Sequence, residues 1–348
     1  MSHILITGGA GFIGSHLAEY YALKGDRVVA IDNLSRSKLL GAGEKHARFN
    51  WEHLEKHYKN IQLVQADIRD QEEVERWARD AEVIIHCAAQ TAVTASLSDP
   101  RSDFDCNVQG TFNLLESARR SRRTQTVIFC STNKVYGENI NNIKVDQNEK
   151  RYFFSDEVFQ KGIPEDFPVD HCSHTPYGCS KLAADLYMQD YGHHYGLKTG
   201  VFRMSCIYGT RQFGLEDQGW VAHFVISSIL GRPISIYGDG KQVRDVLYVS
   251  DLVQAFDCFV KRGKDSEVLN LGGGYKKTLS LLELLNLLEE LLGRRIPVSF
   301  RPWRPSDQKV YISDISKVTK KLGWEPKISP VEGVENLFRW AMDNKRIF

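Results

Sequence analysis

The stretch ILITGGAGFIGSHL, residues 4–17, decides the fold. It joins an apolar run to a glycine-rich turn with the spacing G-x-x-G-x-x-G, and this order predicts a buried strand, a tight turn and an amphipathic helix. Glycines at such a turn let the backbone approach a pyrophosphate at the helix N-terminus. The candidate residues for binding a dinucleotide there are Gly8, Gly11, Phe12, Ile13 and Gly14.

The next apolar run gives that turn its context. Residues 27–31 (RVVAI) predict a second buried strand, and it ends on Asp32, about 20 residues after the glycines. An acid at that place can bind a ribose 2′-hydroxyl, which favours NAD as the cofactor. Asn33 and Ser35 follow it and join the cofactor candidates. Arg36 is close enough to accommodate a 2′-phosphate, so NADP stays open at this point.

Two further strands are predicted, at residues 61–65 and 82–86. Ligands bind outside the carboxyl ends of parallel strands, so the residues after these strands are expected to line the adenine and nicotinamide halves of the cofactor. They are Asp67 and Ile68 after the first strand, and Ala88, Ala89 and Gln90 after the second. Asp67 could instead cap the helix that begins near Asp70.

The alternation of strands and helices continues to residue 130. A helix over 107–119 starts at Asn107, which we count with the cofactor candidates, and a fifth strand follows at 126–130. The polar segment 37–60 predicts a long crossover helix. These elements predict an α/β fold with a Rossmann-type, doubly wound parallel sheet. The apolar faces expected for the two helices are Val108, Phe112, Leu115 and Ala118, and Trp51, Leu54 and Tyr58.

A second stretch, TPYGCSK at residues 175–181, predicts the entry to a helix that carries a base. Tyr177 and Lys181 are spaced i and i+4, so both leave one face and an ammonium lies beside a phenol. A free phenol has a pKa of about 10, and a close, partly desolvated ammonium lowers it. Thr132, after the fifth strand, could share a substrate hydroxyl with Tyr177. The alternatives are a solvated lysine beside a packed tyrosine, and an ordinary turn threonine.

The rest of the chain predicts a smaller substrate lobe. We expect a first domain over residues 1–205, with an inserted loop at 138–172, and a C-terminal α/β lobe over 206–348 from which some segments return to the first domain. Arginine matches the geometry of a diphosphate. The candidate substrate-binding residues are Thr94, Asn133, Lys134, Arg211, Gln218, Arg244, Arg304 and Asp307.

The composition excludes several classes of protein. Of 348 residues, 45 are Lys or Arg and 44 are Asp or Glu, and a net charge of +1 offers no footprint for nucleic acid or an acidic membrane. No apolar run approaches the length of a membrane span, and residues 4–6 lead into a glycine turn rather than a signal-peptide cleavage site. The seven cysteines show no Cys-x-x-Cys spacing, which favours reduced thiols in a cytoplasm and no metal site.

Together, the glycine turn, Asp32 and the Tyr-x-x-x-Lys pair resemble the extended short-chain dehydrogenase/reductase family, and within it the nucleotide-sugar epimerases and dehydratases. The resemblance covers nearly the whole chain. It implies NAD at the glycine turn, a catalytic triad of Thr132, Tyr177 and Lys181, and a nucleotide diphosphate bound by the C-terminal lobe.

Two departures and five matches narrow the choice within that family. The dehydratases carry an Asp-Glu pair directly after the catalytic hydroxyl residue, whereas this chain has Asn133 and Lys134, and an amide cannot donate an acid proton. Cys206 stands where many UDP-sugar enzymes have an asparagine. The separated matches resemble the C2 epimerases of CDP-sugars, which implies a transient 2-keto sugar and tightly held NAD. They are STNKVYG, HTPYGCSK, RQF with DQGW, GKQVRDVL, and Arg-x-Ser-Asp-Gln at 304–308.

Two alternative functions stay open. One is another nucleotide-sugar enzyme on the same scaffold, a 4-epimerase or an NAD-dependent oxidoreductase. The other is a non-catalytic NAD-binding scaffold, although such proteins usually lose the tyrosine or the lysine. Members of the family usually pair through two long helices, here near 107–122 and 178–195, so a homodimer or homotetramer is expected.

Overall fold

The computed structural model describes residues 2–36, 44–304 and 307–348. Two predictions fall partly outside these residues: the segment 37–60, in its first part, and the Arg-x-Ser-Asp-Gln motif, in residues 305–306. The chain divides into two compact units, here called unit 1 and unit 2. Unit 1 comprises Met1–Val135, Thr175–Arg203 and Val253–Leu269, and unit 2 comprises Tyr136–His174, Met204–Leu252 and Asn270–Phe348.

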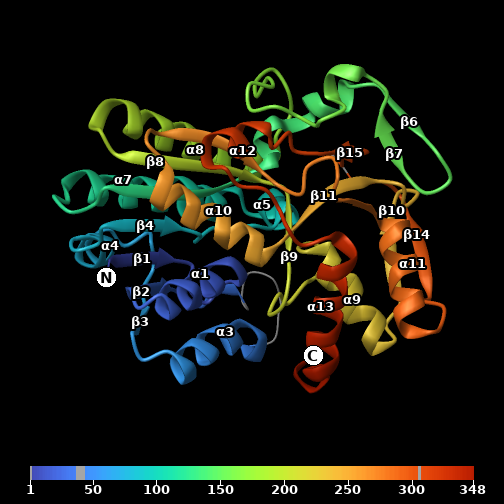
Figure 1. Cartoon of the computed structure of the whole chain (residues 1–348), viewed down its shortest axis with the longest axis horizontal. Coiled ribbons are helices and arrows are strands. Elements are labelled where there is room, and N and C mark those ends of the chain that lie inside the picture. The colour runs from blue at the N-terminus through green and yellow to red at the C-terminus, as the bar shows by residue number, and fades with distance from the viewer. Residues whose placement is uncertain (1, 37–43, 305–306) are drawn as a thin grey trace. The chain divides into compact units, whose positions relative to one another are not determined.

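Unit 1 is built on a seven-stranded sheet with the order β12-β8-β5-β4-β1-β2-β3. The four pairs from β3 to β5 are parallel, and their register aligns Thr7 with Ile31 and with His86 at the carboxyl ends. In Figure 1 the labels β3, β2, β1 and β4 follow one another in this order. The strands are β1 (His3–Thr7), β2 (Arg27–Asp32), β3 (Ile61–Gln65), β4 (Val83–His86), β5 (Thr126–Thr132), β8 (Lys198–Met204) and β12 (Glu267–Leu271).

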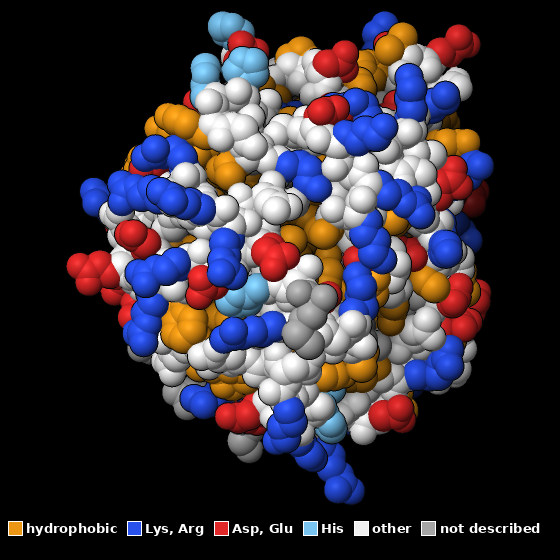
Figure 2. Space-filling model, turned by 60° about the vertical axis from the view of Figure 1, so that its left-hand side comes forward, with side chains coloured by type: hydrophobic (Ala, Val, Ile, Leu, Met, Phe, Trp, Pro, Cys, Tyr) orange, Lys and Arg blue, Asp and Glu red, His pale blue; other side chains and the backbone are white. Residues whose placement is uncertain are grey.

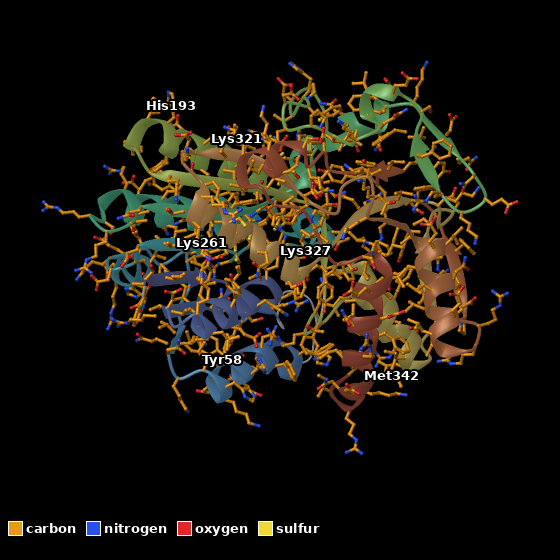
Figure 3. All side chains as sticks on the ribbon, in the orientation of Figure 1. Tyr58, His193, Lys261, Lys321, Lys327 and Met342 are labelled. Carbon is orange, nitrogen blue, oxygen red and sulfur yellow. The ribbon has the colours of Figure 1, made fainter. Side chains whose placement is uncertain are left out.

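Helices cover both faces of this sheet, as the alternating sequence pattern predicted. One face carries α1 (Phe12–Leu23), α3 (Glu44–His57) and α10 (Val249–Arg262). These helices are tied to one another by polar contacts: the Tyr20 hydroxyl donates to Asp257 Oδ2 at 2.9 Å, and the Tyr58 hydroxyl donates to Glu19. Lys261 pairs with Asp257 at 2.7 Å. Figure 3 labels Tyr58 and Lys261 on their segments.

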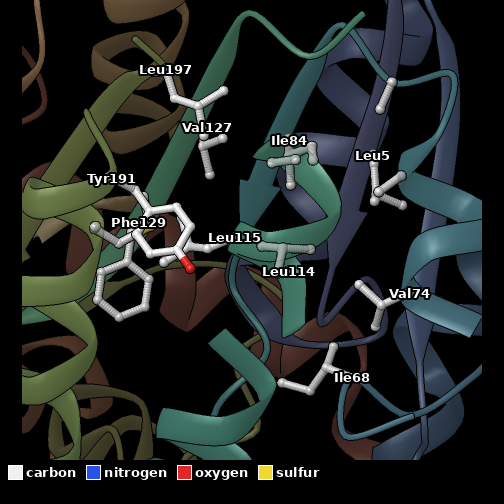
Figure 4. Close-up of a cluster of buried hydrophobic side chains, with 14 of the residues drawn as sticks. Leu5, Ile68, Val74, Ile84, Leu114, Leu115, Val127, Phe129, Tyr191 and Leu197 are labelled. Carbon is white, nitrogen blue, oxygen red and sulfur yellow. The ribbon is translucent and has the colours of Figure 1, made fainter. Parts of the chain in front are cut away.

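The other face carries α4 (Gln71–Ala78), α7 (Gly110–Arg120) and α8 (Thr175–Tyr195), and a cluster of buried hydrophobic residues lies between these helices and the sheet. Short helices lead into α7: α5 (Val93–Ser98), α6 (Pro100–Phe104) and the π-helical turn η1 (Asp105–Gln109). Figure 4 shows side chains from strands and helices meeting in this core. Its labelled members are Leu5, Ile68, Val74, Ile84, Leu114, Leu115, Val127, Phe129, Tyr191 and Leu197.

One predicted core residue of α7 is wrong. Phe112 is 40% exposed, whereas Leu114 is fully buried. The helix does not run straight from residue 107, because the π-helical turn η1 precedes it. The other three predicted residues, Val108, Leu115 and Ala118, are buried, so Phe112 lies at the edge of the buried face and not within it.

Unit 2 combines small sheets with helices. A four-stranded sheet contains β9 (Cys206–Tyr208), β11 (Val243–Tyr248), β13 (Thr278–Ser280) and β15 (Val310–Tyr311), and β10 (Ile234–Tyr237) pairs with β14 (Val298–Arg301). The helices are α9 (Trp220–Leu230), α11 (Leu281–Leu292), α12 (Ser316–Leu322) and α13 (Pro330–Asp343), with short helical turns η2 (Asn133–Asn142), η3 (Glu157–Phe159) and η4 (Lys345–Ile347). Helix α11 begins at Leu281, because Ser280 and Glu283 form a capping box there.

The segment predicted as an inserted loop of the first domain, residues 138–172, clusters with unit 2. It contains the antiparallel hairpin of β6 (Val145–Gln147) and β7 (Tyr152–Phe154). Tyr152 and Phe154 are buried, and the Tyr152 hydroxyl donates to Asp239 Oδ2 at 2.6 Å. Its aromatic side chains therefore find their packing partners in unit 2, which explains why the segment departs from the predicted division.

The surface carries charges of both signs. On the face shown in Figure 2, Lys and Arg side chains are interspersed with Asp and Glu, in keeping with the net charge of +1. No helix among the described residues has the length and apolar character needed to cross a membrane.

Candidate functional site

The glycine turn between β1 and α1 brings backbone segments closer than other residues allow. A Cβ on Gly14 would lie 2.1 Å from the Gly8 carbonyl oxygen, and a Cβ on Gly8 would lie 2.7 Å from the Ala88 nitrogen. Gly8 also has φ +71°, in the left-handed region. Gly11 precedes α1 without a capping side chain, and the first turn of the helix holds no acidic residue. The opening turn, which includes Phe12 and Ile13, is therefore suited to an anion.

Asp32 lies beside that turn at the end of β2. Its Oδ2 accepts the Ala10 N–H at 3.0 Å and its Oδ1 accepts the Leu34 N–H at 2.8 Å. Burial raises the pKa of Asp32, while these two backbone donors and the charge of Arg36 lower it. The carboxylate is thus fixed where a ribose hydroxyl would meet it in a dinucleotide bound at the turn.

Asp67 joins the ends of β2 and β3. Its carboxylate accepts two hydrogen bonds from the Arg69 guanidinium, at 3.0 and 2.7 Å, and one from Asn33 Nδ2 at 2.9 Å. The Arg69 contact lowers the pKa of Asp67 to about 2. The alternative role as a helix cap is wrong, because Asp70 caps α4 by accepting the N–H groups of Glu72 and Glu73.

Two more of the predicted cofactor residues, Ser35 and Ile68, lie in the loops that follow β2 and β3. Ser35 donates its N–H to Asn33 Oδ1 at 3.0 Å, which fixes the loop after β2. Ile68 is buried, and a Cβ on Gly110 would lie 2.5 Å from its Cδ1. The loop after β3 therefore packs directly on the start of α7.

The loop after β4 is held by Asn107, which lies in the π-helical turn η1. The Gln90 N–H donates to Asn107 Oδ1 at 2.9 Å, and Asn107 Nδ2 donates to the Gln90 carbonyl at 3.1 Å. The same Nδ2 donates to Ser180 Oγ on α8 at 3.0 Å. Asn107 was predicted as a cofactor contact. Its side-chain amide instead forms hydrogen bonds that fix the Ala88–Gln90 loop to α8.

Sequence reasoning missed the role of His86, the last residue of β4. Its Nδ1 lies 2.6 Å from Thr7 Oγ1 and its Nε2 lies 2.9 Å from Thr111 Oγ1. Burial lowers the pKa of His86 to about 3, with a further contribution from Lys181, so the ring is neutral. Thr7 in turn accepts the Ala88 N–H at 3.2 Å. A histidine inside the apolar run VIIHCAA was the signal that could have found it.

Tyr177 and Lys181 lie on one face of α8, as predicted, and both are buried. Burial raises the pKa of Tyr177 to about 12, although a hydrogen bond with Thr132 lowers it. Burial likewise lowers the pKa of Lys181 to about 8. The ammonium lies 4.0 Å from the centre of the Phe129 ring. The expected net lowering of the Tyr177 pKa is wrong for this structure, because desolvation of the phenolate outweighs the favourable contacts.

Thr132 is the last residue of β5 and is held by the residues that follow it. Its hydroxyl lies 3.3 Å from Asn133 Oδ1, and its Oγ1 accepts the Lys134 N–H at 3.2 Å. Thr94 is exposed on α5, two residues before Ser96. Ser96 Oγ accepts the Tyr177 N–H at 3.1 Å, so α5 is attached to the start of α8.

A buried ion pair anchors the strand that carries Thr132. Asp185 accepts two hydrogen bonds from the Arg203 guanidinium, at 3.0 and 3.1 Å, and one from Ser131 Oγ at 2.7 Å. Asp185 is four residues after Lys181 on α8, whereas Ser131 precedes Thr132 on β5. This triad therefore fixes the hydroxyl residue and the Tyr–Lys pair to one another.

Unit 2 contains a cavity of about 210 Å³ that is lined by four of the eight predicted substrate residues. The Arg304 guanidinium lies 4.0 Å from the centre of the Tyr237 ring and pairs with Asp217 at 2.9 Å. Arg244 pairs with Asp307 at 2.7 Å. Four predicted residues line the cavity: Gln218, Arg244, Arg304 and Asp307.

Arg211 and Cys206 are the two other residues of unit 2 that the sequence singled out. Arg211 is buried and does not line the 210 Å³ cavity among the described residues. Its φ of +61° places it in the left-handed region. Cys206, which stands where related enzymes were expected to have an asparagine, accepts the indole N–H of Trp220 at 3.3 Å.

The cysteines of the chain are all free thiols. Cys87 comes directly after β4 and Cys130 lies in the neighbouring strand β5, and their sulfur atoms are 3.5 Å apart. Within the described ranges, no group of three or more His, Cys, Asp or Glu side chains is arranged to hold a metal ion.

Comparison with known proteins agrees with this geometry. The family model for GDP-mannose 4,6 dehydratase matches residues 5–337. A CDP-paratose 2-epimerase of Salmonella typhi is 39% identical over 349 residues, which cover 97% of this chain and 98% of the relative.

Solved structures give the same result. The UDP-glucose 4-epimerase of Thermotoga maritima, solved with UDP-glucose, has a TM-score of 0.82 and 33% identity and covers 99% of both chains. The UDP-glucuronic acid 4-epimerase of Bacillus cereus, solved with UDP-glucuronic acid and NAD, has a TM-score of 0.81 and 26% identity and covers 99% of this chain and 100% of that chain. NAD is bound in the Bacillus cereus structure and is the cofactor of the family, and the uncapped helix and the fixed Asp32 fit it. The chain therefore belongs to the GDP-mannose 4,6-dehydratase family of NAD-dependent nucleotide-sugar epimerases and dehydratases.

Proposed function

We propose that this enzyme inverts C2 of a CDP-sugar of the paratose/tyvelose type through a transient 2-keto sugar. The observation that carries the proposal is the pair that follows the catalytic hydroxyl. Asn133 lies with its Oδ1 3.3 Å from Thr132 Oγ1, where a dehydratase would need an acid. An amide cannot protonate a leaving hydroxide, so loss of water has no general acid there. The 39% identity to a CDP-paratose 2-epimerase supports the same choice.

In this proposal the protein moves one proton and holds one oxygen. Bound NAD supplies the acceptor and then the donor of the hydride at the sugar carbon. Tyr177 takes the proton of the C2 hydroxyl and returns it after the sugar has turned. Thr132, which is hydrogen-bonded to Tyr177, shares the bond to the same oxygen. We assign Asn133 and Lys134 to the sugar because they follow Thr132 directly.

The pKa of Tyr177 determines how much free energy is needed to ionise the phenol. With a pKa of about 12, ionisation at pH 7 costs roughly 7 kcal/mol. Lys181, whose pKa is about 8, is mostly charged at pH 7, so its ammonium is available to stabilise the phenolate. We propose that Tyr177, Lys181 and Thr132 form the catalytic triad.

We assign the nucleotide end of the substrate to unit 2. The cavity there offers two guanidinium groups, Arg244 and Arg304, which match the geometry of a diphosphate. Both are paired with carboxylates at 2.7 and 2.9 Å, so a diphosphate would exchange one anionic partner for another. Gln218 and Asp307 complete the set of polar side chains that line the cavity. We infer no such contact for Arg211.

We further propose a homodimer or homotetramer, located in the cytoplasm. Unit 1 exposes large apolar side chains on α5 to α8, and the Phe112 and Tyr187 rings contact each other at 5.7 Å. These exposed residues are Leu97, Phe104, Phe112, Leu186 and Tyr187. A second copy of the chain would remove them from water. Replacing Phe112 and Leu186 with Ser should then yield a monomer in light scattering, and an unchanged mass would contradict this assignment.

A 4-epimerase is the second candidate. It is favoured by the likeness to the UDP-glucose 4-epimerase of Thermotoga maritima, at 33% identity over 99% of both chains. The two candidates share the catalytic residues and differ in the sugar carbon that faces them.

One experiment separates them. Purified protein is incubated with CDP-, GDP- and UDP-sugars in deuterated water without added NAD, and the sugar protons are followed by NMR. Inversion at C2 of a CDP-sugar with protium retained there supports the proposal. Inversion at C4 supports the second candidate. Deuterium at C2 or C5 indicates proton abstraction instead, and the absence of any reaction would contradict both.

A further inference from the structure

Asp103 is a buried acid that the mechanism above does not use. It lies near the end of α6, just before the π-helical turn η1, and is 1% exposed. A carboxylate in such a place must be compensated by hydrogen bonds or charge. Its contacts therefore indicate what it does.

The carboxylate joins the loop after β4 to the π-helical turn. Asp103 Oδ1 accepts a hydrogen bond from Gln90 Nε2 at 2.8 Å and one from Asn107 Nδ2 at 3.2 Å. Gln90 Nε2 also donates to the Ala92 carbonyl at 2.9 Å. Asp103 Oδ1 thus accepts hydrogen bonds from the side-chain amides of Gln90 and Asn107, and these two amides hold the loop that follows Ala89.

The same network reaches the helix that carries the base. Asn107 Nδ2 donates to Ser180 Oγ at 3.0 Å, and Ser180 Oγ donates to the Tyr177 carbonyl at 3.0 Å. Ser180 directly precedes Lys181 in the chain. Asp103 is therefore connected through one amide and one hydroxyl to both members of the Tyr–Lys pair.

We propose that Asp103 is a positioning residue of this enzyme: through Gln90 and Asn107 it fixes the Ala88–Ala92 loop to α8, the helix that carries Tyr177 and Lys181, and it adds a negative charge to their surroundings. The kinetic consequence rests on the proposed function. The placement and the charge effect do not.

The electrostatics agree with this geometry. Burial raises the pKa of Asp103, whereas hydrogen bonds from Ser180 and Gln90 and the charge of Lys181 lower it. The interaction is reciprocal, so the Asp103 carboxylate favours the ammonium of Lys181. After burial, the groups that act on Lys181 are Cys130, Cys106, Asp185 and Cys87. Of the groups that act on Tyr177, Thr132 lowers its pKa, whereas the negative charge of Asp103 and the nearby Cys130 raise it.

The test separates charge from shape. Asp103→Asn keeps an acceptor oxygen for Gln90 and Asn107 but removes the charge. Asp105→Asn, two residues later, with a side chain that is 23% exposed and paired with Arg101 at 2.9 Å, is the matched control. Each protein is prepared with its bound NAD and with 13Cε-labelled lysine, and Lys181 is followed by NMR as pH is varied. Its resonance is identified by its loss in Lys181→Met.

In Asp103→Asn the titration midpoint of Lys181 should fall by roughly 0.5 to 1 pH unit, because the ammonium loses a neighbouring negative charge. With a turned-over sugar, kcat should fall by roughly tenfold while KM stays within about twofold. Asp105→Asn should match the wild type in both measurements.

Two results would overturn the proposal. One is a Lys181 midpoint in folded Asp103→Asn equal to that of the wild type. The other is an equal shift in Asp105→Asn. Should Asp103→Asn not fold, the reciprocal measurement applies: Lys181→Met should raise the titration midpoint of the 13Cγ-labelled Asp103 carboxyl, and no change there would equally overturn it. These readouts need no substrate, so they stand even if the proposed CDP-sugar is not turned over.

Discussion

The proposed catalytic residues of unit 1 and the arginine-lined cavity of unit 2 are built by different means. In unit 1, buried polar groups are fixed by several hydrogen bonds each, as Asp185 is by Arg203 and Ser131. In unit 2, Arg304 and Asp217 pair while 30% and 44% exposed. The first arrangement is rigid before any ligand arrives. The second includes an ion pair that is partly exposed to water and can exchange partners.

This difference has an energetic basis. A buried charge that loses its partner costs several kcal/mol, because water cannot replace the partner. An exposed ion pair contributes about 0–1 kcal/mol. Damage to unit 1 should therefore appear in turnover and stability, and damage to the cavity of unit 2 should appear in substrate affinity.

The largest effect is expected from Tyr177→Phe. Removing the phenol hydroxyl from a residue that is 8% exposed removes the base and should lower kcat by roughly 10³-fold. The content of bound NAD should not change. Tyr187→Phe on the same helix, where the ring is 43% exposed, is the control and should keep full activity. Wild-type turnover in Tyr177→Phe would remove this residue as the base.

The second prediction compares one ion pair from each unit. Asp185→Asn removes the carboxylate that pairs with the buried Arg203, with side-chain exposures of 0% and 5% in the wild type, and should lower the free energy of unfolding by roughly 3–5 kcal/mol. Asp217→Asn should lower it by less than about 1 kcal/mol. Urea denaturation of both variants measures the difference. Equal losses would break the contrast between the two regions.

The third prediction concerns pH and the neutral His86. Its pKa is about 3 in the folded chain, against an ordinary value of 6.5. The unfolded chain therefore binds a proton between these values that the folded chain does not, and stability is lost as pH falls through this window. The contribution between pH 7 and pH 4 is roughly 3 kcal/mol. His86→Gln should flatten the dependence in urea titrations at several pH values, whereas His171→Gln, at a side chain 93% exposed, should retain the wild-type slope.

The smallest effect is expected from Arg304→Ala in the cavity of unit 2. Loss of a charge-assisted contact to a diphosphate should raise KM by roughly 10- to 100-fold with little change in kcat. Arg295→Ala, at a side chain 91% exposed, is the control. A lower kcat with an unchanged KM would place Arg304 in the chemistry, and unit 2 would then not differ from unit 1 in this respect.

Much of unit 1 could be predicted from the sequence because local patterns determine it. The glycine spacing, the acid at the end of β2 and the Tyr-x-x-x-Lys pair each depend on a few neighbouring residues, and the structure places them on one sheet edge and one helix face as expected. The strand at 61–65 was predicted with its observed bounds.

The remaining features depend on contacts between distant segments. His86 and Asp103 acquire their roles from Thr7, Thr111, Gln90 and Asn107, and no spacing rule connects these positions. The sign of the Tyr177 pKa shift depends on how deeply the ring is buried, which the motif does not reveal. The packing of 138–172 within unit 2 likewise rests on partners such as Asp239.

The π-helical turn at Asp105–Gln109 ties the active site to the outer surface of unit 1. One surplus residue in a helix turns Asn107 toward Gln90 and Ser180 and also leaves Phe112 in water. Deleting a single residue there would restore a continuous α-helix and rotate everything after it by about 100°. Neither the cofactor loop nor the exposed aromatic face can then change without the other, so the length of this turn is a shared evolutionary constraint on both.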